Sequence, residues 1–277
     1  MLTKAFISYH HADQTYKDHL CWLARAYGIF EDRSVGTGDI QDDDRSSESI
    51  RRQIRDEYLR DSEVTILLCG VETRWRKHVD WELKSSMIDG RVSRRSGVLV
   101  VNLPGVAEGR ATVGLPQERE VLWRGHAGPW TAFARRSQFE EMYPLMPARI
   151  TDNLLLPKRV AMSVVHWNDV VHDPTRLKWL VDATAAVGRL NDYDLRRPMR
   201  RRNHTGAGLG VPRLEPGMRT MGLGEPPPAW ERPTENLGLG PGVGSPSRGL
   251  GRRPGVGDEG QMRSGGFSNS LRRWGSD

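Results

Sequence analysis

Cysteine is scarce in this chain of 277 residues, which contains only Cys21 and Cys69. Two cysteines are too few for a disulfide framework and fit a reducing compartment, so we expect a cytoplasmic protein in which both are small core residues. Long hydrophobic runs are missing too, because the longest, Val64 to Cys69, is far too short to span a bilayer. The first residues carry no apolar signal core. A membrane partner is therefore not expected.

Lysine is absent from residues 196–277, which hold 14 arginines and 7 acidic residues among many glycines and prolines. The formal net charge of +6 comes from this segment, since residues 1–195 contain 27 basic and 28 acidic residues. A nearly neutral body lacks a basic groove for a phosphate backbone, so no specific nucleic-acid partner is expected. The segment has neither a fixed period nor a hydrophobic face. This predicts a disordered tail, 196–277, after a folded domain, 1–195.

The glycine-bearing loop at residues 36–44 lacks the glycine patterns that hold nucleotide phosphates. It has neither Gly-x-Gly-x-x-Gly nor the Lys-Ser/Thr ending of a P-loop, which argues against a dehydrogenase and a P-loop hydrolase. Its aspartates, among them Asp39 and Asp42, do not have the spacing of a calcium-binding loop, so no metal site is predicted. We interpret it as an acidic solvated loop that lines the site or a subunit contact.

Strand-like and helix-like segments alternate along the first 195 residues. Short β-rich runs predict strands at residues 4–9, 29–30, 64–69, 97–103 and 160–167. Apolar residues at helical spacing predict helices at 15–27, 46–60, up to 87, and 174–190, with Gly28 ending the first of them. Residues 104–157 contain enough aromatic side chains to pack, but no particular structure is predicted for them. The alternation predicts an α/β fold with a parallel sheet covered on both faces.

Residues 74–82 place a carboxylate among aromatic side chains directly after the third predicted strand. Taken alone, Glu82 in the first turns of a helix is typical of a surface acid that the helix dipole favours. His78 lies one helical turn earlier, where it can orient the carboxylate, touch a substrate, or only solvate the helix entrance. Trp75 and Trp81 can stack on a base or on nicotinamide, or they can pack as core residues.

Several stretches of the body resemble the ThsB-like TIR-like domain family of bacterial Thoeris anti-phage defence. They lie at Lys4 to His11, at Ile54 to Leu59 and at residues 76–82, and residues 146–154 add a further match. The resemblance covers residues 4 to about 190. It implies a flavodoxin-like, doubly wound sheet of five parallel strands whose order reverses between the first and the third strand. Ligands of such sheets bind outside the carboxyl ends of the strands at the reversal.

The resemblance also implies cleavage of the bond between nicotinamide and ribose in NAD+, which is then a substrate and not a cofactor. The ADP-ribose part is released or closed into a cyclic signal that activates a separate effector protein, after a phage-derived trigger and in a protein that can form homo-oligomers. Nicotinamide departs uncharged, so one carboxylate suffices, and Glu82 is the predicted catalytic residue. The alternatives are a non-catalytic TIR scaffold and a nucleotide-binding module.

The residues that follow the first and third predicted strands are the candidates for holding the substrate. The side chains after the first strand can contact ribose or phosphate there, or they can be structural. Catalytic TIR domains typically carry Trp four residues before the glutamate, whereas this chain has His at position 78. This difference leaves two questions open, namely which aromatic side chain contacts the substrate and whether the product is linear or cyclic. The predicted substrate-binding set is Ser8, Tyr9, His10, Asp39, Trp75, His78 and Trp81.

Overall fold

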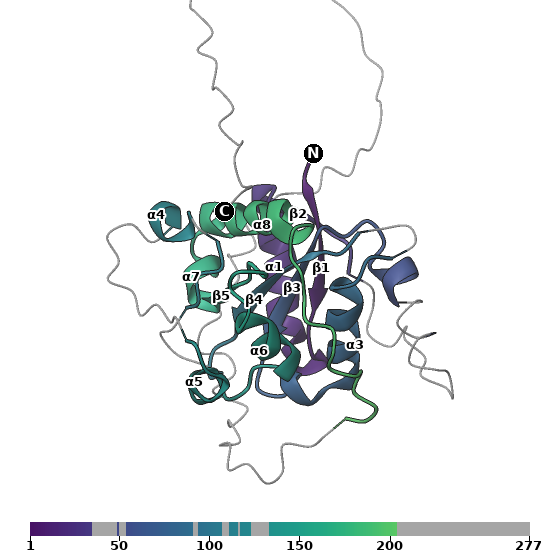
Figure 1. Ribbon diagram of the computed structural model, residues 1–277. Helices are drawn as coiled ribbons and strands as arrows, with labels where there is room; N and C mark the ends of the chain where they lie inside the picture. The colour runs from purple at the N-terminus through teal and green to yellow at the C-terminus, as the bar shows by residue number, and fades with distance from the viewer. Residues whose placement is uncertain are drawn as a thin grey trace, which may run out of the picture. The chain divides into compact units, whose positions relative to one another are not determined.

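The computed structural model describes residues 1–34, 49, 54–90, 94–106, 111–115, 117–122 and 133–203. Five parallel strands form one sheet in the order β2-β1-β3-β4-β5 (Figure 1). The predicted flavodoxin-like topology is confirmed, with the strand order reversing between β1 and β3. The strands are β1 (Thr3–Ser8), β2 (Phe30–Asp32), β3 (Val64–Cys69), β4 (Gly97–Asn102) and β5 (Ser163–His166).

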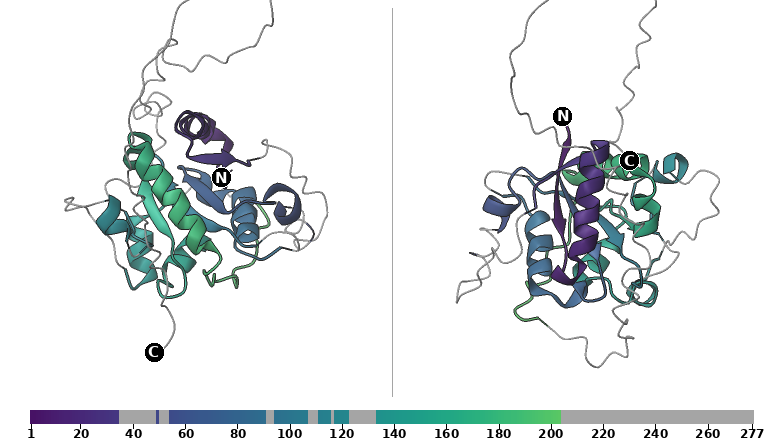
Figure 2. Two further views of the ribbon diagram at one scale, coloured as in Figure 1. Left: turned by 90° about the horizontal axis from the view of Figure 1, so that it is seen from above. Right: turned by 180° about the vertical axis from the view of Figure 1, so that it is seen from behind.

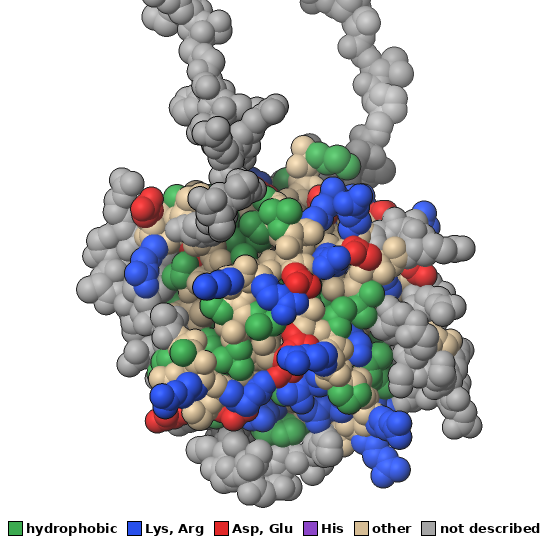
Figure 3. All heavy atoms as spheres, in the orientation of Figure 1, with side chains coloured by type: hydrophobic (Ala, Val, Ile, Leu, Met, Phe, Trp, Pro, Cys, Tyr) green, Lys and Arg blue, Asp and Glu red, His purple; other side chains and the backbone are tan. Residues whose placement is uncertain are grey.

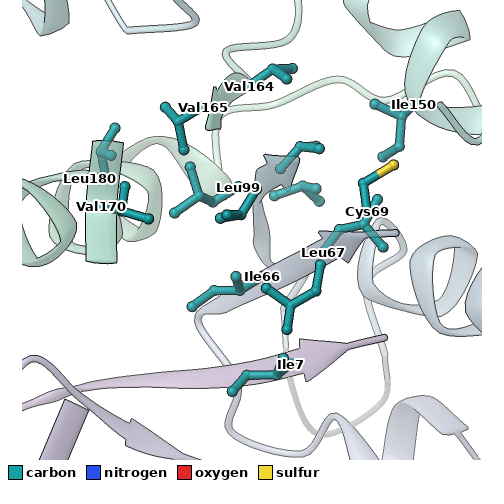
Figure 4. Packing of buried hydrophobic residues seen from close by; sticks show 14 of the residues in the cluster. Ile7, Ile66, Leu67, Cys69, Leu99, Ile150, Val164, Val165, Val170 and Leu180 are labelled. Carbon is teal, nitrogen blue, oxygen red and sulfur yellow. The ribbon is translucent and has the colours of Figure 1, made fainter. Parts of the chain in front are cut away.

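The two central strands are apolar on both faces, as a parallel sheet between two layers of helices requires. Every residue of β3 and of β4 is buried, and Ile66 of β3 lies opposite Leu99 of β4. Figure 4 shows helical side chains on both sides of these strands, with Leu180 of α8 (Pro174–Gly188) near Leu99 and Ile150 of α6 (Ala148–Leu154) near Cys69. The core therefore consists of two apolar layers that the sheet separates.

Two helices cover each face of the sheet (Figures 1 and 2). One face carries α1 (Gln14–Tyr27) and α8, and the other carries α3 (Lys77–Ser86) and α6. Helix α1 ends as predicted, because Gly28 adopts a φ of 60° and its N–H reaches the carbonyl of Ala24. Helix α8 approaches β4 closely at Gly97, where a Cβ atom would lie 2.2 Å from the carbonyl oxygen of Thr184. Only glycine fits at that crossing.

The structure differs from the expected elements in three places: at the end of β5, within residues 104–157, and within residues 46–60. The fifth strand stops at His166, and Trp167 begins α7 (Trp167–Val171) with a fully buried ring that meets Tyr16 edge-on at 5.1 Å. The described part of residues 104–157 contains three short helices, namely α4 (Glu118–Leu122), α5 (Arg136–Met142) and α6. Of the helix predicted over 46–60, the segment Ile54–Tyr58 is π-helical, and most of the remainder lies outside the described residues.

Residues 196–203, called the strap below, run from α8 back across the layer of α3 and α6 (green in Figure 1). The strap is bonded along α3: Trp81 Nε1 donates to the carbonyl of Arg200 at 2.7 Å, Lys84 donates to the carbonyl of Arg197 at 3.1 Å, and the Lys77 N–H donates to Asn203 Oδ1 at 2.8 Å. The strap belongs to the segment predicted as a tail. Residues 204–277 lie outside the described residues, and the division into domain and tail stays a prediction.

We expect the strap to stabilise the domain measurably. Deleting residues 196–277 should lower the free energy of unfolding by about 3 kcal/mol relative to deleting residues 204–277, because it removes the packing of partly buried Met199 and several hydrogen bonds to α3. Urea unfolding of the two truncated proteins measures the difference. Equal stabilities would show that the strap contributes nothing to folding.

The described helices do not include a membrane-spanning candidate: none combines sufficient length with sufficient apolar character.

Candidate functional site

The carboxyl end of β1 and the middle of α3 bring Ser8 and Glu82 together. Ser8 is the last residue of β1 and is fully buried, whereas Glu82 is half-buried. The hydroxyl of Ser8 donates a hydrogen bond of 2.7 Å to Oε2 of Glu82. Because β1 and β3 flank the reversal of strand order, and α3 follows β3, this pair occupies the edge of the sheet where doubly wound folds bind ligands.

Burial raises the pKa of Glu82 to about 7, and the hydrogen bond from Ser8 opposes part of that rise because it favours the charged form. The carboxyl group therefore exchanges protonated and ionised forms near neutral pH. Such tuning is typical of carboxyl groups at functional sites, although buried structural carboxyl groups show it as well. A charged Glu82 next to a cationic ligand would gain more from the interaction than a solvated surface acid would.

The raised pKa makes a prediction about stability. The folded protein binds a proton at Glu82 up to about pH 7, whereas the unfolded chain loses it near the ordinary value of 4.5, so the contribution of Glu82 to folding falls as the pH rises between these values. Glu82→Gln removes this unfavourable contribution. We expect the substitution to stabilise the protein by about 2–3 kcal/mol at pH 8, and much less at pH 5.

Urea unfolding of both proteins at the two pH values measures this difference. Exposed Glu120 of α4 offers a matched control, because Glu120→Gln makes the same chemical change outside the site. A stabilisation by Glu82→Gln that is the same at pH 5 and pH 8 would contradict the assigned ionisation.

Trp81 lies in a small apolar cluster beside the Ser8–Glu82 pair. Its ring, only 5% exposed, packs with Phe6 of β1, with Ile54 and Leu59, and with Met199 of the strap. Since its indole N–H is bonded to the strap, both the face and the edge of Trp81 have partners within the protein. The packing interpretation of Trp81 accounts for these contacts, and a stacking role with substrate stays a prediction.

His78 lies one turn before Glu82, with its ring 5.1 Å from that of Trp81 in an edge-on arrangement. Burial and the neighbouring Lys77 charge lower the pKa of His78, so its imidazole is neutral at pH 7. A neutral imidazole can donate or accept a hydrogen bond. His78 therefore remains a candidate contact for a polar part of the substrate.

The other predicted substrate contacts have structural partners. Tyr9 donates its phenolic proton to Gln14 at 2.6 Å, and the ring of buried His10 caps the short 3₁₀ turn before α1 by accepting from the Ala12 N–H at 3.4 Å. Trp75 belongs to the main core. A contact of these three residues with the substrate stays a prediction. Asp39 lies outside the described residues, so its predicted role is not placed.

A buried ion pair behind α3 did not figure among the predicted site residues. The side chain of Arg149 in α6 is completely buried, and its guanidinium binds both carboxylate oxygens of Asp80 in α3, at 2.9 and 3.1 Å. The same guanidinium donates to the carbonyls of Arg197 and Pro198 in the strap. Asp80 and Arg149 both lie in stretches that carry the family resemblance, which is the only sequence signal that singles them out.

The five-stranded parallel sheet and its reversal of strand order are the fold that the resemblance implies. Residues 6–108 match the family model "Thoeris protein ThsB, TIR-like domain". The resemblance to the ThsB family is thus confirmed over this part of the chain, which runs from β1 past β4. No curated protein matches the chain.

The ThsB match contains both Ser8 and Glu82 and therefore covers the candidate site itself. It ends before α4, so Arg149 and the strap lie beyond it. The ThsB family belongs to Thoeris anti-phage defence. The connection between α3 and the strap is, in contrast, a feature of this chain that the family match does not describe.

Proposed function

We propose that this protein cleaves the bond between nicotinamide and ribose in NAD+, with Glu82 as the catalytic residue. The observation that carries the proposal is the carboxylate of Glu82, half-buried and fixed by Ser8, at the edge of the sheet where the strand order reverses. The match of residues 6–108 to the ThsB family supports it, because TIR-like domains of this kind often consume NAD+.

Cleavage of the nicotinamide–ribose bond needs a positioned negative charge from the protein and no general acid. The C1′–N bond breaks with both electrons moving to the pyridinium nitrogen, so nicotinamide leaves neutral without a proton from an acid. Positive charge then develops on the ribose ring. The ionised carboxylate of Glu82 would stabilise that charge and hold a ribose hydroxyl, while Ser8 fixes its orientation.

The pKa of Glu82 fits this role when substrate charge is considered. Without a ligand the carboxyl group is close to half-ionised at pH 7. The positive pyridinium of NAD+ in the site favours the ionised form, because an opposite charge within a few ångströms lowers the pKa of a carboxyl group. Substrate binding would thus ionise the group that the bond cleavage needs.

The ribosyl cation then reacts with one of two nucleophiles. Attack by water, which loses a proton to solvent, gives ADP-ribose, whereas attack by the adenosine end of the same molecule gives a cyclic product. We propose that the product, in cyclic form, activates a separate effector protein of anti-phage defence. The free, buried thiols of Cys21 and Cys69 support placing this activity in the cytoplasm.

The direct test incubates the purified protein with NAD+, with and without lysate of phage-infected cells, and follows nicotinamide and the ADP-ribose product by mass spectrometry. Nicotinamide release that the trigger increases would support the proposal. Absence of release under both conditions would favour the alternative, a TIR scaffold that acts through assembly.

A further inference from the structure

A small pocket opens where the strap crosses between α3 and α6, on the flank of α3 away from Glu82. Its volume is about 200 Å³, and its wall includes Arg74, Arg76 and Asp80 near the start of α3 and Arg197 and Arg200 of the strap. Figure 3 shows Lys and Arg side chains gathered on this face in the region that the strap crosses. Apolar residues such as Val79 and Met199 complete the wall, and its charged side chains are four arginines and one aspartate.

Asp80, the carboxylate in this wall, is already neutralised. Oδ1 accepts from Arg149 Nε, and Oδ2 accepts from Arg149 Nη2 and from the backbone N–H of Arg200. Arg197 is paired with Asp152, and Arg76 is paired with Glu72. The four arginines of the wall and Arg149 behind it carry five positive charges, and the three carboxylates paired with them carry three negative charges. The cluster therefore keeps a net charge of +2.

The excess charge lies on Arg74 and Arg200. Arg74 donates to the carbonyl of Pro144 and lies over the ring of Trp75, whereas Arg200 donates to the carbonyl of Arg74 at 3.1 Å. Neither guanidinium has a carboxylate partner among the described residues. Burial lowers the pKa of Arg200, and repulsion by Arg74, Arg197 and Arg149 lowers it further against the attraction of Asp80. An anion in the pocket would relieve this repulsion.

The backbone adds to the positive potential. The pocket lies at the beginning of α3, a helix of ten residues whose N-cap, Arg76, makes no capping hydrogen bond with its side chain. The positive end of the helix dipole therefore lies close to the arginines of the pocket, although the Lys77 N–H is bonded to Asn203. Two sources of positive potential, the guanidinium groups and the helix end, thus lie beside one open pocket.

We propose that this pocket binds a phosphate-bearing anion. A volume of about 200 Å³ is below the usual range for a complete drug-sized ligand, which suits a diphosphate or a phosphate group rather than a whole nucleotide. Arginine is suited to the task, because its planar guanidinium binds phosphate oxygens through paired hydrogen bonds.

This site is separate from the proposed catalytic site. Asp80 and Glu82 are two residues apart in α3 and point to different flanks, since one bonds Arg149 of α6 and the other bonds Ser8 of β1. A bound anion would also hold the strap to the start of α3, because Arg200 belongs to the strap and Arg74 precedes the helix. The site thus connects ligand binding to the helix that carries Glu82.

Isothermal titration of the full-length protein with inorganic pyrophosphate at low ionic strength tests the proposal. We expect saturable binding that Arg200→Ala weakens about 10-fold or more, since the substitution removes one charged hydrogen-bond partner. The substitution keeps the contacts of residue 200 to Asp80 and Trp81, which use its backbone N–H and C=O, and removes one side-chain hydrogen bond, to the carbonyl of Arg74. Arg74→Ala is a second variant with the same expected effect.

Two control variants distinguish binding in this pocket from attraction by overall charge and from binding at the catalytic site. Arg159→Ala removes an equal charge from an exposed ion pair with Asp192, and it should leave pyrophosphate binding unchanged. Glu82→Gln should also leave it unchanged, so the result does not depend on the proposed enzymatic activity. Titration with ADP-ribose, and with adenosine as its phosphate-free counterpart, distinguishes a nucleotide source of the anion from free diphosphate.

Absence of saturable pyrophosphate binding would overturn the proposal, as would equal binding by the wild type and the Arg200→Ala and Arg74→Ala variants. Weakening by Arg159→Ala to the same degree would overturn it too, because it would show attraction by net charge alone. Loss of ADP-ribose binding in Arg200→Ala, without any effect on adenosine, would support the pocket as a nucleotide-phosphate site.

Discussion

Glu82→Gln is expected to lower the rate of nicotinamide release from NAD+ by about 10² to 10³, the usual loss when a preorganised charge is removed from a reacting centre. Glutamine keeps the size of the side chain and an oxygen that can accept the Ser8 hydrogen bond. The substitution therefore removes the negative charge and little else. Initial rates of nicotinamide release at saturating NAD+ and pH 7 measure the effect.

The contrast between activity and stability makes this test specific. The same substitution is expected to stabilise the fold above pH 7, so a loss of activity cannot come from unfolding. Glu120→Gln, the exposed control, should retain the activity of the wild type. Release by Glu82→Gln at the wild-type rate would remove Glu82 from the mechanism and would leave binding or assembly as the function of the site.

The second large effect concerns stability alone. Arg149→Met is expected to lower the free energy of unfolding by about 3 kcal/mol, because it leaves the carboxylate of Asp80, which is only 14% exposed, without its charged partner. It also removes the hydrogen bonds to the carbonyls of Arg197 and Pro198. Chemical denaturation of the variant and the wild type under the same conditions measures the loss.

The appropriate comparison for Arg149→Met is a surface ion pair. Arg159 and Asp192 are both more than half exposed, and Arg159→Ala should change the stability by less than about 1 kcal/mol. The double variant Asp80→Asn/Arg149→Met should recover part of the loss, since it no longer buries a lone charge. If Arg149→Met were no more destabilising than Arg159→Ala, the pair would not be the structural link that we infer.

Much of the sheet could be predicted because its signal is local. The run from Val64 to Cys69 is apolar at every position but one, which indicates a strand buried on both faces, and the structure confirms it. Gly28 likewise marks the end of α1. The sequence signal fails where tertiary packing decides: Trp167 ends the stretch predicted as the fifth strand, yet the chain turns into α7 there and buries the ring against Tyr16.

The candidate site was predictable only in part. The family resemblance selected Glu82, and the expected crevice placed Ser8 near it, but no pattern in the chain specifies a hydrogen bond between residues 74 positions apart. The contacts of the strap were not predictable, since Arg-rich sequence without periodicity gives no sign of docking. The groups with which the strap makes these bonds are largely its own peptide groups, which every sequence has.

The strap is held mainly through its backbone, whereas its contribution to the pocket comes from side chains. Its carbonyl and N–H groups hold it to Trp81, Lys84 and Asp80, whereas the guanidinium of Arg200 projects toward the pocket. A different side chain at position 200 would change what the pocket attracts at the loss of one side-chain hydrogen bond, to the carbonyl of Arg74, while the backbone bonds keep the course of the main chain. Ligand preference can therefore evolve here at a small structural penalty.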